Sequence, residues 1–412
     1  MEYRPRALGT LAFFIVPACL AQPPELELVT FDAPPYQVVE IIGNGHRSIT
    51  GETVDTVTCA SELAGWSANI TLAPQKRAIY SLQKNSVDGY FAADPSAELD
   101  TMASRSNPVA LEKWYFFTQD PTAEPDLRRI GVVDGSNEEA WLLANGYEVY
   151  LSITSPSQLL ALLERGRIDA ALMDERVMVW LRARNELSTE SLNSHFLRYA
   201  PLHFYVAETF QKAHPEFLPA FNKALPSCTA KTLTPTSREI KHIESLTKRL
   251  LAELTKLLNI QQALKAGPQP GTFAEVLNID SKWQALAPKT MPPLAAHILA
   301  LPASKTLEVW QSSYQGLVTE VMLVNSMGSI AAMSQLTSDY WQGDELKFLE
   351  VAGPELAADP QDRKPLFISP IRYDQSTARF QITVSAPIVL GSENTPNGVI
   401  VIGLDIEKAM GI

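Results

Sequence analysis

The first 230 residues alternate short apolar runs with amphipathic stretches, a pattern typical of an α/β protein. Apolar runs predict strands, and apolar residues recurring at three- and four-residue steps predict the helices between them. The predicted strands are residues 26–31, 70–72, 87–91, 114–117, 130–133, 147–150, 168–174 and 199–204. The predicted helices begin within residues 45–55 and at residues 74, 137, 157 and 217. This order predicts open sheets covered by helices.

The pattern changes after residue 236. From Ser237 to Ala266, apolar residues recur at helical spacing in a charged background and predict one long amphipathic helix, which ends at Gly267. Two interpretations stay open: the helix covers a core, or it takes part in signalling or dimerisation. Beyond it, strands are predicted at residues 318–324, 330–333, 366–371, 378–387 and 398–404, with a helix opening within 337–345. These elements predict an α+β domain.

Residues 1–21 have the pattern of a signal peptide. Arg4 and Arg6 precede an apolar run from Leu8 to Ala21 that is too short to span a bilayer comfortably. We expect cleavage after Ala21; the alternative is a lipoprotein signal in which Cys19 carries the lipid. No later run reaches 18 apolar residues. The sequence therefore predicts a periplasmic protein, with lipid at Cys19 as the one conceivable tether.

Composition narrows the function further. The chain has 412 residues, 46% of them hydrophobic and 19% charged, which predicts a folded protein of two or three domains. Its formal net charge of -12 argues against a nucleic-acid partner. Cleavage after Ala21 leaves two cysteines, Cys59 and Cys228, and a pair in an oxidising compartment predicts a disulfide. Two buried free thiols are the alternative.

Motifs for catalysis or metal binding do not occur. The six histidines lack metal-ligand spacing, and the sequence contains neither a G-x-S-x-G elbow nor a Walker loop. We therefore expect no metal, no cofactor and no catalytic residue.

Several segments between Leu26 and Cys228 occur in the order found in one known family. A strand leads to Pro34-Pro35-Tyr36; Val87-Asp88-Gly89 precedes a small-residue loop and Ser106-Asn107-Pro108; and L-x-x-G-x-I-D-A-A-x-x-D ends at Asp174. This order resembles periplasmic solute-binding proteins of the amino-acid-binding type (extracellular solute-binding family 3). The resemblance implies a two-lobed α/β type II periplasmic-binding fold over residues 22–230. Lobe 1 would comprise residues 26–108 and 200–230, and lobe 2 residues 109–199.

The resemblance also implies a ligand site between the lobes. Its expected residues are Tyr36, Tyr90, Ala92, Ser96, Arg105, Ser136, Asn137 and Asp174. Asp174 matches the acid that pairs with a ligand ammonium. However, Leu99 stands where the family has the arginine that holds a ligand carboxylate, and Arg105 is the candidate to replace it. We therefore expect a cationic or neutral ligand.

The C-terminal part resembles a Cache/PAS-like extracytoplasmic sensor domain. The order strand, Asn325-Ser326-Met327-Gly328, strand, Thr337-Ser338-Asp339-Tyr340, helix and three strands carries this resemblance. It implies such a domain over residues 282–412, after a helical linker at 231–281. If that domain has a pocket, its expected lining residues are Tyr340, Trp341, Asp344 and Tyr373.

Together these features predict non-enzymatic binding and sensing of a small polar solute in the periplasm. A membrane sensor protein is then the expected partner. The alternative is the solute-binding component of an ABC uptake transporter, whose partner is a permease. An enzyme on the same two-lobed fold is a further alternative that no sequence motif favours.

Overall fold

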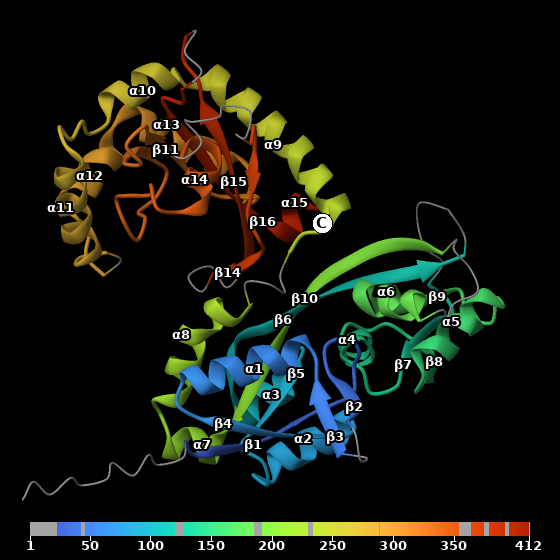
Figure 1. Ribbon diagram of the computed structural model, residues 1–412. Coiled ribbons are helices and arrows are strands. Elements are labelled where there is room, and N and C mark those ends of the chain that lie inside the picture. Colours follow the sequence, from blue (N-terminus) through green and yellow to red (C-terminus); the bar gives the residue numbers. More distant parts are fainter. Residues whose placement is uncertain are drawn as a thin grey trace, which may run out of the picture.

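The computed structural model describes residues 23–42, 46–119, 127–184, 192–229, 234–287, 289–353, 364–374, 379–391 and 395–411. The expected signal peptide and Cys19 lie outside these ranges. The described residues form a two-lobed α/β unit and a C-terminal α+β domain (Figure 1). Within them, no helix is both long and apolar enough to cross a membrane.

Lobe 1 is built on β1 (Glu25–Thr30), β4 (Ser67–Leu72) and β5 (Gly89–Ala93), with β1 parallel to both neighbours. Its helices are α1 (Glu52–Leu63), α2 (Gln75–Gln83), α3 (Ala97–Met102), α7 (Glu208–Ala213) and α8 (Phe217–Thr229). Apolar side chains of these strands and helices form one core cluster. The strands lie close to the ranges predicted from sequence.

The first helix of lobe 1 begins within the predicted range of residues 45–55: α1 starts at Glu52, after Gly51 at φ 122°. The hairpin that precedes it was not predicted. It consists of the antiparallel strands β2 (Val38–Ile42) and β3 (His46–Thr50). β-branched residues dominate β2, and such residues favour strand over helix.

Two long strands, β6 (Ala103–Thr118) and β10 (Asn193–Ala207), run antiparallel from lobe 1 into lobe 2. They lie at the centre of one eight-stranded sheet of order β4-β1-β5-β10-β6-β9-β7-β8. Lobe 2 adds β7 (Ile130–Val133), β8 (Val149–Ile153), β9 (Ala170–Asp174), α4 (Asn137–Ala144), α5 (Pro156–Glu164) and α6 (Glu175–Ala183). We call β6 and β10 the hinge strands, because they connect the two lobes.

A disulfide joins Cys59 in α1 to Cys228 near the end of α8. The two cysteines are 169 residues apart in the sequence. The bond therefore ties the first helix of lobe 1 to its last, after the chain has passed through lobe 2 and returned.

The predicted long helix is two helices. Helix α9 (Ser237–Leu257) ends before Leu258, and α10 (Ile260–Ala266) follows it. The side chain of Asn259 accepts a hydrogen bond from the backbone N–H of Gln262 at 3.0 Å and so caps α10. Asparagine is favoured at such a cap, which explains the break inside a continuous apolar pattern.

The C-terminal domain is an antiparallel sheet with helices on both faces. β11 (Val318–Asn325), β12 (Ile330–Met333), β13 (Phe367–Ile368), β15 (Arg379–Ile388) and β16 (Gly398–Asp405) lie in the order β12-β11-β16-β15-β13, and β14 (Arg372–Asp374) pairs with β15. α9, α10 and α13 (Pro302–Ser313) share one core cluster with this sheet. α11 (Phe273–Gln284), α12 (Pro293–Ala300) and α14 (Leu346–Ala352) share another, and α15 (Ile406–Ala409) follows β16.

Residues 231–281 were expected to be a helical linker, and in the structure their first helix packs against the C-terminal sheet, in agreement with the interpretation that it covers a core. The apolar side of α9, with Ile243, Leu246, Leu250 and Leu254, is buried against the C-terminal sheet. The expected boundary at residue 282 falls inside α11. The apolar stripe of α9 is therefore part of the C-terminal core, because burying it against the sheet removes it from water.

Candidate functional site

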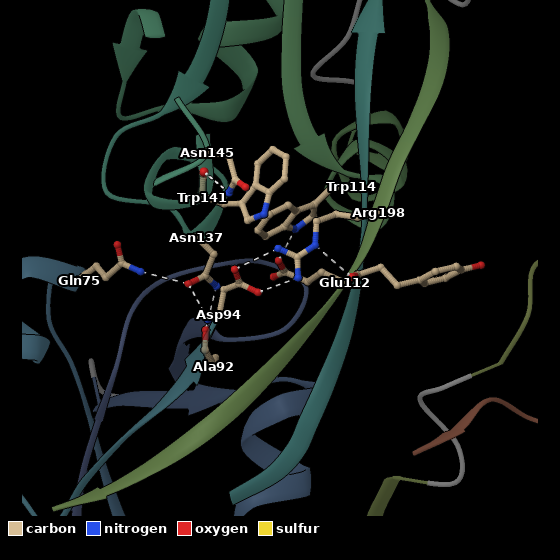
Figure 2. A network of polar contacts seen from close by, with 10 residues as sticks. Gln75, Ala92, Asp94, Glu112, Trp114, Asn137, Trp141, Asn145 and Arg198 are labelled. Carbon is tan, nitrogen blue, oxygen red and sulfur yellow. Dashed lines mark hydrogen bonds and ion pairs between the residues drawn. The ribbon is translucent and has the colours of Figure 1, made fainter. Parts of the chain in front are cut away.

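The two lobes meet in a closed cleft that is bridged by Asn137 at the start of α4. Its Nδ2 donates to the carbonyl oxygen of Ala92 at 2.9 Å, and its Oδ1 accepts from the backbone N–H of Asp94 at 3.1 Å. Oδ1 also accepts from Nε2 of Gln75 at 3.1 Å. Figure 2 shows these contacts running from lobe 2 to two segments of lobe 1. Asn137 therefore joins lobe 2 to two segments of lobe 1.

Asp174 makes a second bridge between the lobes. Its Oδ1 accepts from the hydroxyl of Tyr36 at 3.0 Å and from the backbone N–H groups of Arg176 and Val177 at 2.8 and 3.3 Å. Its Oδ2 accepts from the backbone N–H of Lys113 at 2.7 Å. Asp174 was expected to hold a ligand ammonium, but here both oxygens accept from groups of the protein, and Oδ1 caps α6.

A guanidinium lies at the centre of the cleft. Arg198, on hinge strand β10, donates from Nη1 and Nη2 to the two carboxylate oxygens of Asp94 at 3.2 and 3.3 Å. Its guanidinium carbon lies 5.0 Å from the ring centre of Trp114 and 5.6 Å from that of Trp141. Both distances are within the range of cation–π attraction. Figure 2 shows the guanidinium among these three side chains.

Four carboxylates crowd this region: Asp94, Glu112, Glu138 and Asp174. Burial raises the pKa of Asp94 to about 6, even though Arg198 acts in the opposite direction. Burial, reinforced by repulsion from Asp174, raises the pKa of Glu138 to about 7. Burial also raises the pKa of Glu112, and repulsion from Glu138 and Asp174 adds to the effect. The closed cleft therefore favours positive charge.

The remaining predicted ligand residues are held by local contacts. Tyr90 is fully buried in the lobe 1 core, and Ser96 and Ser136 cap α3 and α4 by accepting from Leu99 N and Glu139 N. Ala92 has φ 68°, a left-handed conformation that costs an alanine roughly 1–2 kcal/mol. Its carbonyl oxygen accepts a hydrogen bond from Nδ2 of Asn137. Ala92 and Asn137 were both expected to bind the ligand, and the sequence did not indicate that they contact each other.

Arg105, the candidate to replace the missing family arginine, pairs with a carboxylate of lobe 1. Its Nε lies 3.5 Å from Oδ1 of Asp100, and its side chain is 40% exposed. Leu99 itself is buried in the lobe 1 core. Neither residue takes part in the contacts described above that bridge the lobes, and a ligand role of Arg105 stays a prediction.

Several cleft residues were not predicted from the sequence: Asp94, Glu112, Trp114, Glu138, Trp141 and Arg198. Some signal was present. Glu112 and Trp114 are two apart on one strand and therefore face the same side, where the Trp114 Nε1–H donates to Glu112 Oε2 at 2.7 Å. Asp94 follows a buried strand directly, a common place for ligand contacts in α/β sheets.

The outer mouth of the cleft holds a cavity of about 350 Å³. Lobe 1 contributes Phe31, Asp32 and residues 72–76, and lobe 2 contributes Val133, Asp134, Gly135 and Thr154. A second hollow, beside Tyr36 and Arg176, has a volume of only about 10 Å³. No solute larger than water fits the second hollow. The lobes are therefore packed together beside Tyr36 and Arg176.

The structure does not bring all four expected pocket residues of the C-terminal domain together. Tyr340 is fully buried against Trp283, and Trp341 donates from Nε1 to the carbonyl oxygen of Met327 at 3.0 Å. Asp344 is exposed. Tyr373 lies elsewhere and lines a cavity of about 380 Å³ with Asn107, Pro108 and residues of α8. Tyr340 therefore packs in the core while Tyr373 lines a different cavity, and a ligand pocket of this domain stays a prediction.

On the side of the hinge away from the cleft, the strands contact the start of α9. Nζ of Lys113 lies 2.6 Å from Oε2 of Glu239, and the hydroxyl of Tyr199 donates to Oε1 of the same carboxylate. Lys113 and Tyr199 are paired neighbours on β6 and β10. Glu239 also accepts from the backbone N–H of Thr236 at 2.6 Å and completes the capping box of α9. We call Lys113, Tyr199 and Glu239 the hinge contact.

Comparison with known proteins gives a likeness of structure only. No family model matches the chain, and no curated protein matches its sequence. An amino acid ABC transporter substrate-binding protein from Streptococcus pneumoniae, solved with L-arginine, is 18% identical and covers 50% of this chain and 89% of its own, with a TM-score of 0.41. A histidine kinase sensor domain with similarity to periplasmic binding proteins is 17% identical and covers 51% and 97%, with a TM-score of 0.42.

A third similar structure is an ancestral amino-acid-binding protein described as a precursor of cyclohexadienyl dehydratase. It is 15% identical and covers 50% of this chain and 94% of its own, with a TM-score of 0.40. All three likenesses span about half of the chain at low TM-scores. The ligands and partners of these proteins are therefore not carried over, and the assignment of two lobes rests on the strand order given above. The Cache/PAS-like assignment of the C-terminal domain stays a prediction.

Proposed function

We propose that this chain is a non-enzymatic, exported sensor whose lobes bind a small polar solute and transmit their closure to the C-terminal domain. The hinge contact is the observation that carries this proposal. The side chains of Glu239 and Lys113 are 2% and 7% exposed. The contact is therefore buried between a hinge strand and α9, which the sequence analysis assigned to different domains. A fused domain fixed to the hinge is positioned to respond when the hinge bends.

Strand alternation explains how one hinge serves two sides. Glu112 and Trp114 face the cleft, whereas Lys113 between them faces Glu239. On β10, Arg198 faces the cleft and the next residue, Tyr199, faces Glu239. Because successive side chains of a strand point to opposite faces, any twist of these strands moves both sets together.

Helix α9 is suited to carry such a movement. It has 21 residues, which corresponds to a rod about 31 Å long. Tyr199 and Leu111 of the hinge strands belong to the same core cluster as α9 and the C-terminal sheet. The N-terminal end of α9 also lies beside α15, where a ring nitrogen of His242 contacts the carbonyl oxygen of Ala409 at 2.9 Å. Figure 1 shows α9 extending from the hinge along the C-terminal domain.

The character of the cleft supports a cationic or amine-bearing solute. Four carboxylates, Asp94, Glu112, Glu138 and Asp174, surround a region whose aromatic walls are Trp114, Trp141 and Tyr36. Burial already raises the pKa of all four carboxyl groups, and an anionic solute would add repulsion to that cost. Protons and a cationic solute would therefore compete for the oxygens of these carboxyl groups.

Export is part of the proposal and has two supports. The N-terminal pattern of basic and apolar residues is that of a signal peptide, and the Cys59–Cys228 disulfide suits an oxidising compartment. An uptake component of an ABC transporter also fits export and solute binding. The fixed hinge contact favours sensing, because uptake alone gives no reason to attach a domain at the hinge.

The test begins with a thermal-shift screen of the exported full chain against amino acids, polyamines, carboxylates and aromatic metabolites. A solute that binds the folded state raises the melting temperature by mass action. Hydrogen exchange of α9 is then measured with and without the stabilising solute, in the wild type, in Glu239→Gln and in Glu244→Gln. Glu244→Gln makes the same chemical change on the same helix, outside the hinge contact.

We expect the solute to change exchange in α9 in the wild type and in Glu244→Gln, and to lose that effect in Glu239→Gln. A solute that binds without changing α9 exchange would contradict sensing and leave simple uptake. A screen in which nothing stabilises the protein would contradict the binding function itself.

A further inference from the structure

The guanidinium of Arg198 is bound as a ligand would be. Asp94 receives it through two nearly parallel N–H···O contacts of 3.2 and 3.3 Å, which is the bidentate geometry that selects a guanidinium. The indole rings of Trp114 and Trp141 approach its carbon at 5.0 and 5.6 Å. The Nε–H donates to the carbonyl oxygen of Tyr199 at 3.2 Å. All three nitrogens of the cation thus have a hydrogen-bond acceptor, and two indole rings lie near its carbon.

These partners come from every part of the two-lobed unit. Asp94 follows β5 of lobe 1, Trp141 lies in α4 of lobe 2, and Trp114 lies on hinge strand β6. Arg198 itself reaches them on a long side chain that is 24% exposed. A group at this place therefore holds both lobes at once, and it remains accessible from outside.

The Arg198 guanidinium is surrounded by more carboxylates than the one with which it pairs. Glu112 and Glu138 lie close enough to Asp94 and Asp174 for repulsion to raise the pKa of Glu112, although burial is the larger cause. One guanidinium is thus placed among several carboxylates that repel one another. The site favours a cation at this position, whether it is covalently attached or free.

We propose that the side chain of Arg198 is an internal occupant of a guanidinium-binding site, and that the solute of this protein carries a guanidinium group that displaces it. The inference rests on the solute-binding function proposed above and names the class of solute. A free guanidinium would pair with Asp94 and contact both indoles, while Arg198, hinged on β10, swings away. Displacement therefore acts directly beside Tyr199 and the hinge contact.

A second arginine of the cleft provides the matched control. Arg176 pairs with Glu52 across the lobes, and its guanidinium carbon lies 4.9 Å from the ring centre of Tyr36. It has one aromatic neighbour of this kind, and it lies in α6 rather than on a hinge strand. Loss of either arginine loosens the same interface, but we expect only the site of Arg198 to bind a free guanidinium.

The experiment uses the full chain with Arg198→Ala or Arg176→Ala and low millimolar methylguanidinium, with the neutral analogue methylurea as the control solute. We expect methylguanidinium to raise the melting temperature of Arg198→Ala by about 2 °C or more at ten times its dissociation constant. Methylurea should leave Arg198→Ala unchanged, and neither solute should stabilise Arg176→Ala. Equal effects of the two solutes on Arg198→Ala, or equal rescue of both variants by methylguanidinium, would overturn the inference.

If Arg198→Ala does not fold alone, refolding yield replaces melting temperature. A higher yield with methylguanidinium than with methylurea supports the inference, and equal yields, zero included, overturn it. The wild-type screen separates this result from the proposed function. A wild type stabilised only by solutes without a guanidinium, with no rescue of Arg198→Ala, would retain solute binding and reject the guanidinium site. Rescue of Arg198→Ala with a wild type that binds nothing would retain the site and reject solute sensing.

Discussion

Lys113 and Glu239 form an ion pair, with Nζ and Oε2 2.6 Å apart, in which both side chains are almost completely buried. Burial alone would raise the pKa of Glu239, but Lys113 and the donors Tyr199 and Thr236 outweigh it and lower that pKa. The pair joins the centre of a hinge strand to the first turn of α9. It therefore links the two-lobed unit directly to the helix that packs on the C-terminal sheet.

We expect replacement of one partner of this pair to destabilise the protein strongly. Glu239→Gln leaves a buried ammonium and Lys113→Met leaves a buried carboxylate, each at a cost of about 3–5 kcal/mol. The double variant should lose less than the sum of the two single variants, because no uncompensated charge remains. Chemical denaturation of the four proteins measures the coupling. Additive losses would contradict a direct interaction.

Asn137 should control how firmly the lobes close. Asn137→Ala removes its hydrogen bonds to Ala92 O, Asp94 N and Gln75, which all cross from lobe 2 to lobe 1. We expect the ligand-free protein to populate an open form with a larger radius of gyration in small-angle X-ray scattering. Asn145→Ala, at the other end of the same helix, removes only a local bond to Trp141 O and should leave the scattering curve unchanged. An identical curve for Asn137→Ala would reject the role.

Stability should decrease as pH rises from about 6.5 to 8. Glu138 has a folded-state pKa of about 7, above its ordinary value of 4.5, so the folded state binds more protons than the unfolded state between these values. Its contribution is therefore lost as pH rises through about 7. The groups that face Glu138 are Asp174, Glu112 and Ser136, which hydrogen-bonds to it. Asp94, which faces Arg198, has a pKa of about 6, so its contribution to stability also falls as pH rises.

Glu138→Gln tests this assignment. The variant should melt higher than the wild type at pH 8 and show a smaller change in melting temperature between pH 6.5 and 8. Below pH 6.5 His203 acts oppositely, because burial lowers its pKa to about 4 and its protonation then favours the unfolded state. An unchanged pH profile in Glu138→Gln would show that the carboxyl group is not responsible.

Removal of the disulfide should lower stability without changing the fold. Cys59 and Cys228 close a loop of 169 residues, and the chain-entropy treatment gives a loss of about 5 kcal/mol, with about 2–5 kcal/mol typical on removal of a native bridge. Denaturation of the double variant Cys59→Ala/Cys228→Ala measures the loss. The mass of the exported wild type under non-reducing conditions is the control, and two free thiols there would contradict the bond.

Local patterns in the sequence determined most secondary structure of this protein. Apolar runs such as Ile130 to Val133 gave the strands, and Ser136, directly before a helical pattern, gave a helix start that the structure places at Asn137. These features depend on neighbours within a few residues, so a single sequence contains them. The hairpin between Val38 and Thr50 was not predicted, because its strand pattern lies directly before the pattern of helix α1.

Tertiary structure alone decided which side chains meet. Alternation along β10 places Arg198 and Tyr199 on opposite faces, but only the pairing of β10 with β6 brings one to Asp94 and the other to Glu239. Asp94 and Arg198 are 104 residues apart, and Lys113 and Glu239 are 126 apart. Contacts over such separations are set by how the lobes close and how α9 packs. The sequence showed that Leu99 stands where the resembling family has an arginine. It did not show that the guanidinium of Arg198 lies in the cleft, because that position depends on a fold that brings carboxylates and indoles around it.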